Sequence, residues 1–218
     1  MMNNREIMLK EIGINTVEEK LTATRWFEIV KNKKLSEDFI EEFQEALTWR
    51  RIERYQTLSE KFISKHKEKL NTKSISRYQQ LTEEFMRENY HSLSWFHISE
   101  SQQLSEEFIR DFKDELNWHN VCKKQNLSNN FIKKFEHLFY WNKISMYQNR
   151  TIEFYDKFKN KICWGSYFYR QKSDFHIMKK YICKTNYVKM KEFKTSHLDK
   201  SQKKEIERLL KFKYMFTK

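Results

Sequence analysis

The chain has 218 residues, with no proline and only two glycines, Gly13 and Gly165. Sandwiches, barrels and dinucleotide-binding folds need both residue types at turns and phosphate loops, so this composition argues against them and favours helices joined by short polar connections. Aromatic residues make up 16% of the chain, which excludes the class of disordered proteins because such surface is worth burying.

The net charge of +13 is unevenly distributed along the chain. Residues 1–126 contain 21 Lys and Arg against 22 Asp and Glu, whereas residues 127–218 contain 22 against 8. This C-terminal excess favours contact with nucleic acid, an anionic membrane or an acidic protein surface, although it also serves solubility. Three widely spaced cysteines without a CxxC pattern indicate a reducing, cytoplasmic setting. No apolar run is long enough to span a membrane, and the N-terminus has no signal-peptide core.

The N-terminal segment, residues 1–34, is predicted to be a cap. Residues 1–11 indicate a short leading helix. Residues 12–34 form a degenerate repeat that keeps Trp26 but lacks the opening of the later copies. That opening is complete in Leu104–Asn126, whose sequence is LSEEFIRDFKDELNWHNVCKKQN.

Residues 35–172 contain six copies of this 23-residue unit without insertions. We number positions from 0, so that position 0 is Leu35, Leu58, Leu81, Leu104, Leu127 and, degraded, Arg150. Position 1 is Ser or Thr, position 4 is Phe and position 21 is Gln in every copy, and position 12 is apolar, with Leu138 displaced by one residue. Position 14 is Trp in every copy except the one that opens at Leu58, which has Thr72 instead. If Trp26 of the degenerate repeat is included, this one position holds all six tryptophans of the chain. A fixed period of this length indicates a solenoid or a related array.

Each unit is predicted to form two short helices. The hydroxyl at position 1 caps the first helix, acidic residues at positions 2 and 3 suit its dipole, and apolar positions 4, 5, 8 and 12 form one buried stripe. Position 13 starts the second helix, whose buried face carries positions 14, 17 and 20, the last being Tyr55, Tyr78 and Tyr147. The helices should be roughly 15 and 10 Å long, too short to be stable without their neighbours.

The predicted fold is therefore all-α, an α-solenoid of about seven 23-residue two-helix repeats with an N-terminal cap and a divergent basic C-terminal cap, residues 173–218. In that cap, Tyr187 stands at the tryptophan position, and Ser196 or Ser201 is expected to open a terminal helix. The alternative is an α/β solenoid like the leucine-rich repeats, which share this range of periods.

The repeats resemble the tryptophan-repeat proteins of large insect DNA viruses and similar LSEEF-type arrays of phages. The resemblance covers residues 35–172 and rests on the LS-E-E-F-I openings, the tryptophan at position 14, and segments such as ISRYQ at 75–79 and ISMYQ at 144–148. It implies a viral or phage origin and a place in the host-cell cytoplasm. The family brings no assigned chemistry to these positions, and Thr72 and the basic end depart from its pattern.

No catalytic residue, cofactor site or metal site is predicted. The chain lacks nucleophile, P-loop and GxGxxG motifs, and the carboxylates at positions 2, 3, 7 and 11 are interpreted as solvated faces. The pairs His119–Cys122 and His176–Cys183 supply too few ligands for structural zinc. The tryptophans are interpreted as a core series rather than as a platform for nucleic-acid bases. We therefore expect a protein that is not an enzyme.

Positions 15, 16 and 19 of the second helix should point away from the core and carry recognition, together with the basic end. The candidate partner-binding residues are Arg50, Arg54, Arg77, His119, Lys123, Lys143, Tyr169, Arg170, Lys179, Lys180, Lys189, Lys191, Lys203 and Lys204. The expected function is that of a non-enzymatic repeat-scaffold binding protein, an inhibitor that blocks a host defence protein or ribonucleoprotein with an acidic surface. The alternative is direct binding of RNA or single-stranded DNA through the basic C-terminal region.

Overall fold

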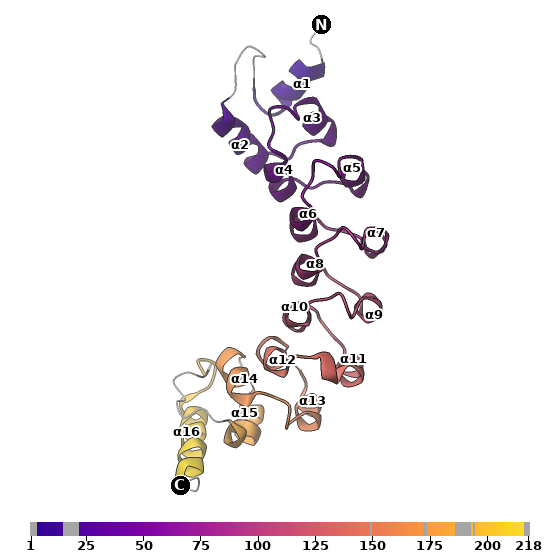
Figure 1. Cartoon of the computed structure of the whole chain (residues 1–218). Coiled ribbons are helices and arrows are strands. Elements are labelled where there is room, and N and C mark those ends of the chain that lie inside the picture. Colours follow the sequence, from indigo (N-terminus) through magenta and orange to yellow (C-terminus); the bar gives the residue numbers. More distant parts are fainter. Residues whose placement is uncertain are drawn as a thin grey trace. The chain divides into compact units, whose positions relative to one another are not determined.

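A computed structural model shows an all-α chain built as a solenoid-like series of helix pairs (Figure 1). The structure describes residues 4–14, 22–148, 150–171, 174–185, 193 and 195–215. These residues contain no strand, so the alternative of a leucine-rich-repeat-like solenoid is wrong. The chain divides into two compact units, Met1–Glu115 and Leu116–Lys218, and each is described by itself.

The first unit places its two kinds of helix in two rows (Figure 1). It opens with α1 (Asn4–Glu11). The first helices are α3 (Glu37–Glu42), α5 (Glu60–Lys65), α7 (Glu83–Glu88) and α9 (Glu106–Asp111), and the second helices are α2 (Ala23–Asn32), α4 (Trp49–Tyr55), α6 (Thr72–Tyr78) and α8 (Trp95–Ser101). The second helices pack against one another in sequence, from α2 to α8.

The second unit continues the same alternation. Its first helices are α11 (Asn129–Lys134), followed by a 3-10 turn η1 (Glu136–Leu138), α13 (Ile152–Lys157) and α15 (Phe175–Tyr181), followed by η2 (Ile182–Lys184). Its second helices are α10 (Trp118–Lys124), α12 (Trp141–Tyr147) and α14 (Trp164–Arg170), which also pack in sequence. The terminal helix α16 (Lys200–Met215) packs on α15 and η2.

The first helices begin where the sequence predicts. At position 1 the hydroxyl accepts a hydrogen bond from the backbone N–H of the phenylalanine at position 4 in five of the copies, those that open at Leu35, Leu58, Leu81, Leu104 and Leu127. The α-helical part, however, spans six residues, or about 9 Å, so the predicted length is wrong. The helix ends after position 7 because the residue at position 8, the C-cap, has backbone dihedral angles outside the helical region.

Helix α16 has a different cap from the predicted one. The backbone N–H of Gln202 donates to Asp199 Oδ1 at 2.8 Å, and the Gln202 side chain accepts from the Asp199 N–H at 3.1 Å. This is a reciprocal capping box. Asp199 therefore opens the helix, and the expectation of Ser196 or Ser201 is wrong.

The glutamine at position 21 joins adjacent repeats through buried hydrogen bonds. Gln79 accepts from the backbone N–H of Leu58 at 2.9 Å and donates Nε2 to the carbonyl oxygens of Glu53 at 2.7 Å and Gln56 at 2.8 Å. Gln102 makes the equivalent three hydrogen bonds one repeat later. The two carbonyls belong to the end of the preceding second helix, where backbone acceptors lack intrahelical partners. One side chain thus caps one repeat and fixes the start of the next.

The glutamate at position 2 forms a second connection between repeats. Glu37 accepts from the backbone N–H of Ser59 at 2.6 Å and from its hydroxyl at 3.0 Å. Glu60 and Glu83 bind the next hydroxyl residue in the same way. The interpretation of position 2 as a solvated face is therefore wrong, because each of these carboxylates accepts two hydrogen bonds from the cap residue of the following repeat.

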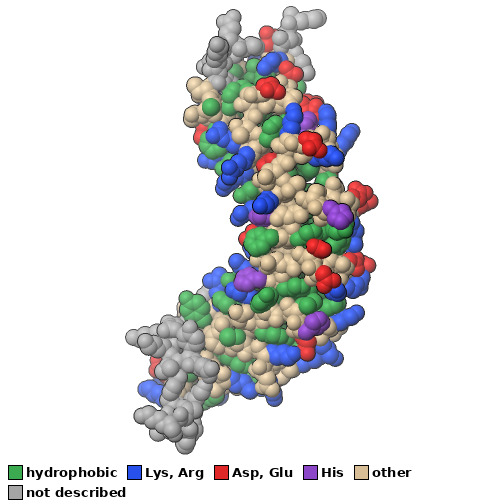
Figure 2. Space-filling model, in the orientation of Figure 1, with side chains coloured by type: hydrophobic (Ala, Val, Ile, Leu, Met, Phe, Trp, Pro, Cys, Tyr) green, Lys and Arg blue, Asp and Glu red, His purple; other side chains and the backbone are tan. Residues whose placement is uncertain are grey.

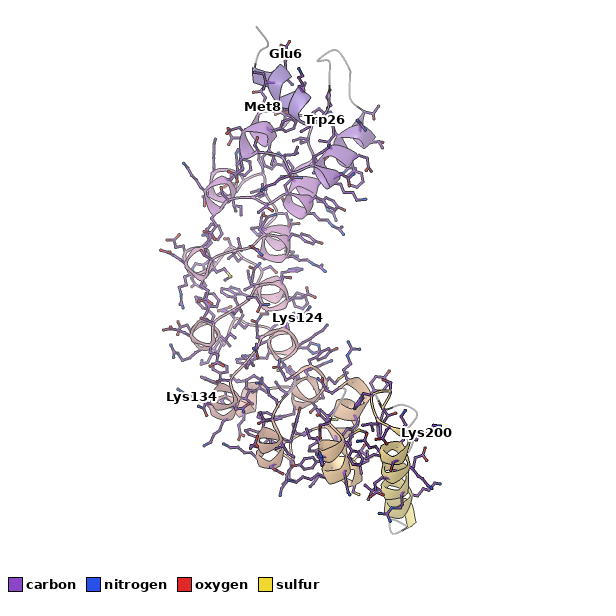
Figure 3. All side chains as sticks on the ribbon, turned by 180° about the vertical axis from the view of Figure 1, so that it is seen from behind. Glu6, Met8, Trp26, Lys124, Lys134 and Lys200 are labelled. Atoms are coloured by element: carbon purple, nitrogen blue, oxygen red, sulfur yellow. The ribbon has the colours of Figure 1, made fainter. Side chains whose placement is uncertain are left out.

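The tryptophan at position 14 packs on the first helix of the following repeat. Trp95 stacks on Phe112 with 4.8 Å between ring centroids and lies 6.0 Å from Phe108, while its indole N–H donates to the Tyr90 carbonyl at 3.0 Å. Trp26, labelled in Figure 3, packs against the core of the first unit in the same way. These rings are half-buried, so their faces are occupied by protein.

Replacing Trp95 with alanine should destabilise the protein by about 3 kcal/mol, at the lower end of large-to-small core changes because the ring is only half-buried. Its neighbour Phe96 is 52% exposed on the same helix, so Phe96→Ala should change stability by less than about 0.5 kcal/mol. Urea unfolding followed by circular dichroism measures both. Equal effects of the two substitutions would contradict this packing.

The structure corrects two predicted core positions, position 20 of the second helix and position 12 of the fifth copy. Tyr55 and Tyr78 at position 20 are exposed, because three-residue steps drift by about 60° on a helix with 3.6 residues per turn. Position 21 returns to the buried face instead. In the fifth copy the buried residue at position 12 is Phe139, and Leu138 is only half-buried.

The three cysteines are free and differ in exposure: Cys122 is buried, whereas Cys163 and Cys183 are exposed. Burial raises the pKa of the Cys122 thiol to about 11, and the thiolate is the reactive form. Iodoacetamide at pH 8 should therefore alkylate Cys163 and Cys183 in the native protein and Cys122 only after denaturation. Peptide mass spectrometry gives the result, and modification of native Cys122 at a comparable rate would contradict it.

Candidate partner-binding surface

The outward face of the second helices carries most of the predicted binding residues. In the first unit, positions 15 and 19 place Arg50 and Arg54 on α4 and Arg77 on α6, and all three are exposed. Lysine and arginine side chains gather over these helices in Figure 2. Positions 14, 17, 18 and 21 of each second helix face the core. The remaining positions of the helix, such as 15 and 19, therefore face outward.

A basic pocket of about 590 Å³ lies on this face. Its lining contains five cationic side chains and one carboxylate, together with polar groups and one tyrosine: Arg50, Arg54, Lys69, Lys73, Arg77, Glu53, Asn71, Ser74, His97 and Tyr78. The five lysine and arginine charges against the one glutamate charge leave an excess of +4. We call this site the basic pocket.

Two tyrosine rings contact the guanidinium groups of the basic pocket: Tyr78, which lines it, and the neighbouring Tyr55. Arg54 lies 5.3 Å from the Tyr55 ring centroid and 5.6 Å from that of Tyr78, and Arg77 lies 5.5 Å from the Tyr78 ring. Cation–π contacts of this kind are worth roughly 0.5–1 kcal/mol at exposed sites. They restrain the arginines while leaving their N–H donors free of carboxylates: among the described residues, none pairs ionically with Arg50, Arg54, Lys73 or Arg77.

Glu53 forms the buried floor of the basic pocket and is only 1% exposed. Its Oε1 accepts from the Asn71 backbone N–H at 2.6 Å, and its Oε2 is buried without a hydrogen-bond partner. The same position 18 is Ser76 one repeat later, and its hydroxyl accepts from the Ser94 N–H in the equivalent bond. Glu53 thus fulfils a structural role and places one unsatisfied acceptor beneath the cations.

The second unit holds a smaller cluster on its second helices. Lys123 on α10 and Arg170 on α14 each lie 5.5 Å from the ring of Tyr147 on α12. His119 packs edge-on against Tyr140, a residue that is 54% exposed. The structure therefore brings Lys123 and Arg170 together around one tyrosine. Lys143 and Tyr169 lie on the same helices, with Lys143 half-buried and Tyr169 exposed.

The predicted residues of the basic end are less available than their charge suggests. Lys180 pairs with Asp156 at 2.7 Å, and Lys179 lies 3.7 Å from Glu205. Hydrogen bonds from Lys180 and then Tyr181 hold the pKa of Asp156 below its usual value, so the pair stays charged.

Four further lysines of the prediction complete this region. Lys203 and Lys204 lie on α16, which begins at Lys200, labelled in Figure 3. Lys203 is half-buried and Lys204 is exposed. Lys189 and Lys191 lie outside the described residues.

The list of candidate partner-binding residues omits Lys73 and Tyr78, although both line the basic pocket. Lys73 stands at the outward position 15, and that placement alone could have selected it. Tyr78 was assigned to the core by the three-residue spacing. Among the residues described, no helix combines the length and apolarity needed to cross a membrane, and no three His, Cys, Asp or Glu are grouped to hold a metal ion.

The arrangement can bind an anionic group through several charge-assisted hydrogen bonds at once, because three guanidinium groups line one pocket. Comparison of the chain with protein-family models, curated proteins and solved structures gives no match.

Proposed function

We propose that this protein is a non-enzymatic repeat-scaffold binding protein whose second-helix face docks an acidic surface of a partner protein or ribonucleoprotein. The basic pocket is the observation that carries this proposal. Arg50, Arg54 and Arg77 line it without an ion-paired carboxylate among the described residues. A carboxylate or phosphate of a partner would gain bidentate hydrogen bonds from these guanidinium groups.

The composition of this face supports a protein partner over a bare nucleic-acid strand. Arginine and tyrosine are the residue types that carry most binding energy in protein interfaces, and Arg54, Tyr78 and Arg77 form one contiguous set. The next second helix adds Phe96, which is 52% exposed. An exposed aromatic ring beside an arginine pocket suits an interface with an apolar centre and an acidic rim.

The resemblance to viral and phage tryptophan-repeat proteins supports a narrower form of the proposal. The partner is then a host defence factor, such as a nucleic-acid-targeting effector, which the scaffold blocks in the host-cell cytoplasm. An effector of this kind has an acidic surface or carries its own nucleic acid. Either would complement the basic pocket.

A second candidate is direct binding of RNA or single-stranded DNA by the C-terminal region. Two observations support it. Residues 127–218 contain 22 basic residues against 8 acidic residues, and three lysines, Lys200, Lys203 and Lys204, lie near the start of α16. Positive charge is disfavoured at that end of a helix dipole, so a bound phosphate would relieve it. The pairing of Lys179 and Lys180 with carboxylates weakens this candidate.

Affinity capture from a native-host lysate, with and without nuclease, separates the two candidates. The proposed function predicts that a specific protein is retained after nuclease treatment and is lost when the basic pocket is altered. Direct nucleic-acid binding predicts a gel shift of RNA or single-stranded DNA at low salt that weakens steeply as salt rises. Retention of nucleic acid alone would contradict the first candidate.

A further inference from the structure

One repeat lacks the aromatic contact that joins its neighbours. In the other described repeats of the first unit, the ring at position 14 packs on the ring at position 8 of the next copy, as in Trp26–Phe43 at 5.6 Å and Trp95–Phe112 at 4.8 Å. The copy that opens at Leu58 has Thr72 at position 14, and the following copy has Asn89 at position 8. Both members of the contact are therefore replaced together.

A second pocket, of about 470 Å³, lies where this aromatic pair would pack. We call it the Thr72 pocket. Its apolar lining is buried or nearly so, and its polar lining leaves it open to solvent; the residues are Ile63, Leu70, Ile75, Phe85, Leu93, Ser64, Lys67, Glu68, Thr72, Asn89 and Ser92. Cavities of this volume with an apolar floor and a few polar groups are typical of ligand sites.

The filled repeats show which hydrogen bond an occupant would make. The indole N–H of Trp95 donates to the carbonyl of Tyr90, and that of Trp164 donates to the carbonyl of Lys159 at 2.9 Å. Both acceptors stand at position 9 of their own copy. Position 9 of the copy that opens at Leu58 is Lys67, which lines the Thr72 pocket. The pocket thus combines the apolar floor, the ring of Phe85 and the carbonyl position that hold an indole elsewhere in this chain.

We propose that the Thr72 pocket binds the indole ring of a tryptophan on a partner protein. The occupant comes from another molecule because the six tryptophans of this chain are themselves packed at position 14 against aromatic rings. The same packing excludes a folded second copy as the donor. The site is separate from the basic pocket and does not rest on the acidic partner proposed above.

Fluorine NMR of 5-fluoroindole added to the whole protein tests this proposal without interference from the native tryptophans. The ligand resonance should broaden and shift with the native chain at millimolar or lower concentration, as expected for so small a ligand. Thr72→Trp fills the pocket and should weaken binding by at least roughly 10-fold. Thr72→Ser keeps the space and should bind as the native chain does. A fluorinated benzofuran, which lacks the N–H, should bind more weakly than the indole.

A short peptide with a central tryptophan, used as an unlabelled competitor, distinguishes a protein side chain from free indole. Displacement of 5-fluoroindole by the peptide, and not by its alanine counterpart, supports the proposal. If Thr72→Trp does not fold, as judged by circular dichroism, Asn89→Phe is used in its place, because it closes the other half of the pocket. Absence of binding to the native chain, equal binding to a folded filled variant, or failure of the peptide to compete would overturn the proposal.

Discussion

Gln79→Leu should destabilise the protein by about 3–4 kcal/mol, the largest effect we expect from a single substitution. The change removes three buried hydrogen bonds, to Leu58, Glu53 and Gln56. It leaves one backbone N–H and two carbonyls of these residues without a partner, and each unsatisfied buried group costs about 1–3 kcal/mol. Leucine has a similar volume, so the loss arises from hydrogen bonding rather than from a cavity.

The adjacent residue supplies a matched control. Gln80 is exposed, so Gln80→Leu makes the same chemical change without removing a bond between repeats, and its effect should stay within about 0.5 kcal/mol. Gln79→Glu is a second test variant, because a carboxylate keeps the shape but cannot donate to two carbonyls; it should also destabilise the protein. Urea unfolding of the three variants gives the comparison. Similar midpoints for Gln79→Leu and Gln80→Leu would show that the amide does not join the repeats.

Reversing two charges in the basic pocket should reduce affinity for an acidic partner by roughly 100-fold, which corresponds to about 2.7 kcal/mol. Arg54→Glu with Arg77→Glu replaces two guanidinium donors by carboxylates and changes the pocket's excess from +4 to zero. It also removes the cation–π contacts to Tyr78. Attraction turns into repulsion at the same positions, and the dependence of affinity on salt should become weaker.

The control for this prediction must change the total charge equally. Lys34 and Lys61 are exposed and do not line the basic pocket, so Lys34→Glu with Lys61→Glu has the same charge change at other places. Surface plasmon resonance against the captured partner at two salt concentrations measures both double variants. If the two lose affinity equally, binding depends on net charge and not on the basic pocket.

The sequence predicted the repeat, its two helices and the hydroxyl caps of the first helices because these depend on local spacing. The hydroxyl at position 1 and the phenylalanine at position 4 are three residues apart, within reach of one helix turn. The role of Gln79 was not predictable in that way. Its partners are backbone groups 21 to 26 residues away, and only the packing of one repeat on the next brings them within hydrogen-bond distance.

The exposure of the candidate binding residues was also predictable in part, because it too depends on local spacing. Outward position 19 places Arg54 and Arg77 on the exposed face of the second helices, and this placement follows from helical periodicity alone. The Thr72 pocket required knowing that position 14 of one copy faces position 8 of the next. Thr72 was visible as an exception in the sequence, but Asn89 gained meaning only when the structure placed it opposite.

Site-specific photocrosslinking tests most directly whether the second-helix face is the binding surface. Two exposed aromatic residues of the first unit provide the positions: Phe96 lies on second helix α8, and Tyr90 lies in the turn after first helix α7. A photoreactive phenylalanine at each position is irradiated in the complex with the partner retained after nuclease treatment. We predict crosslinking from position 96 and little from position 90. Crosslinking from position 90 alone would contradict the proposed surface.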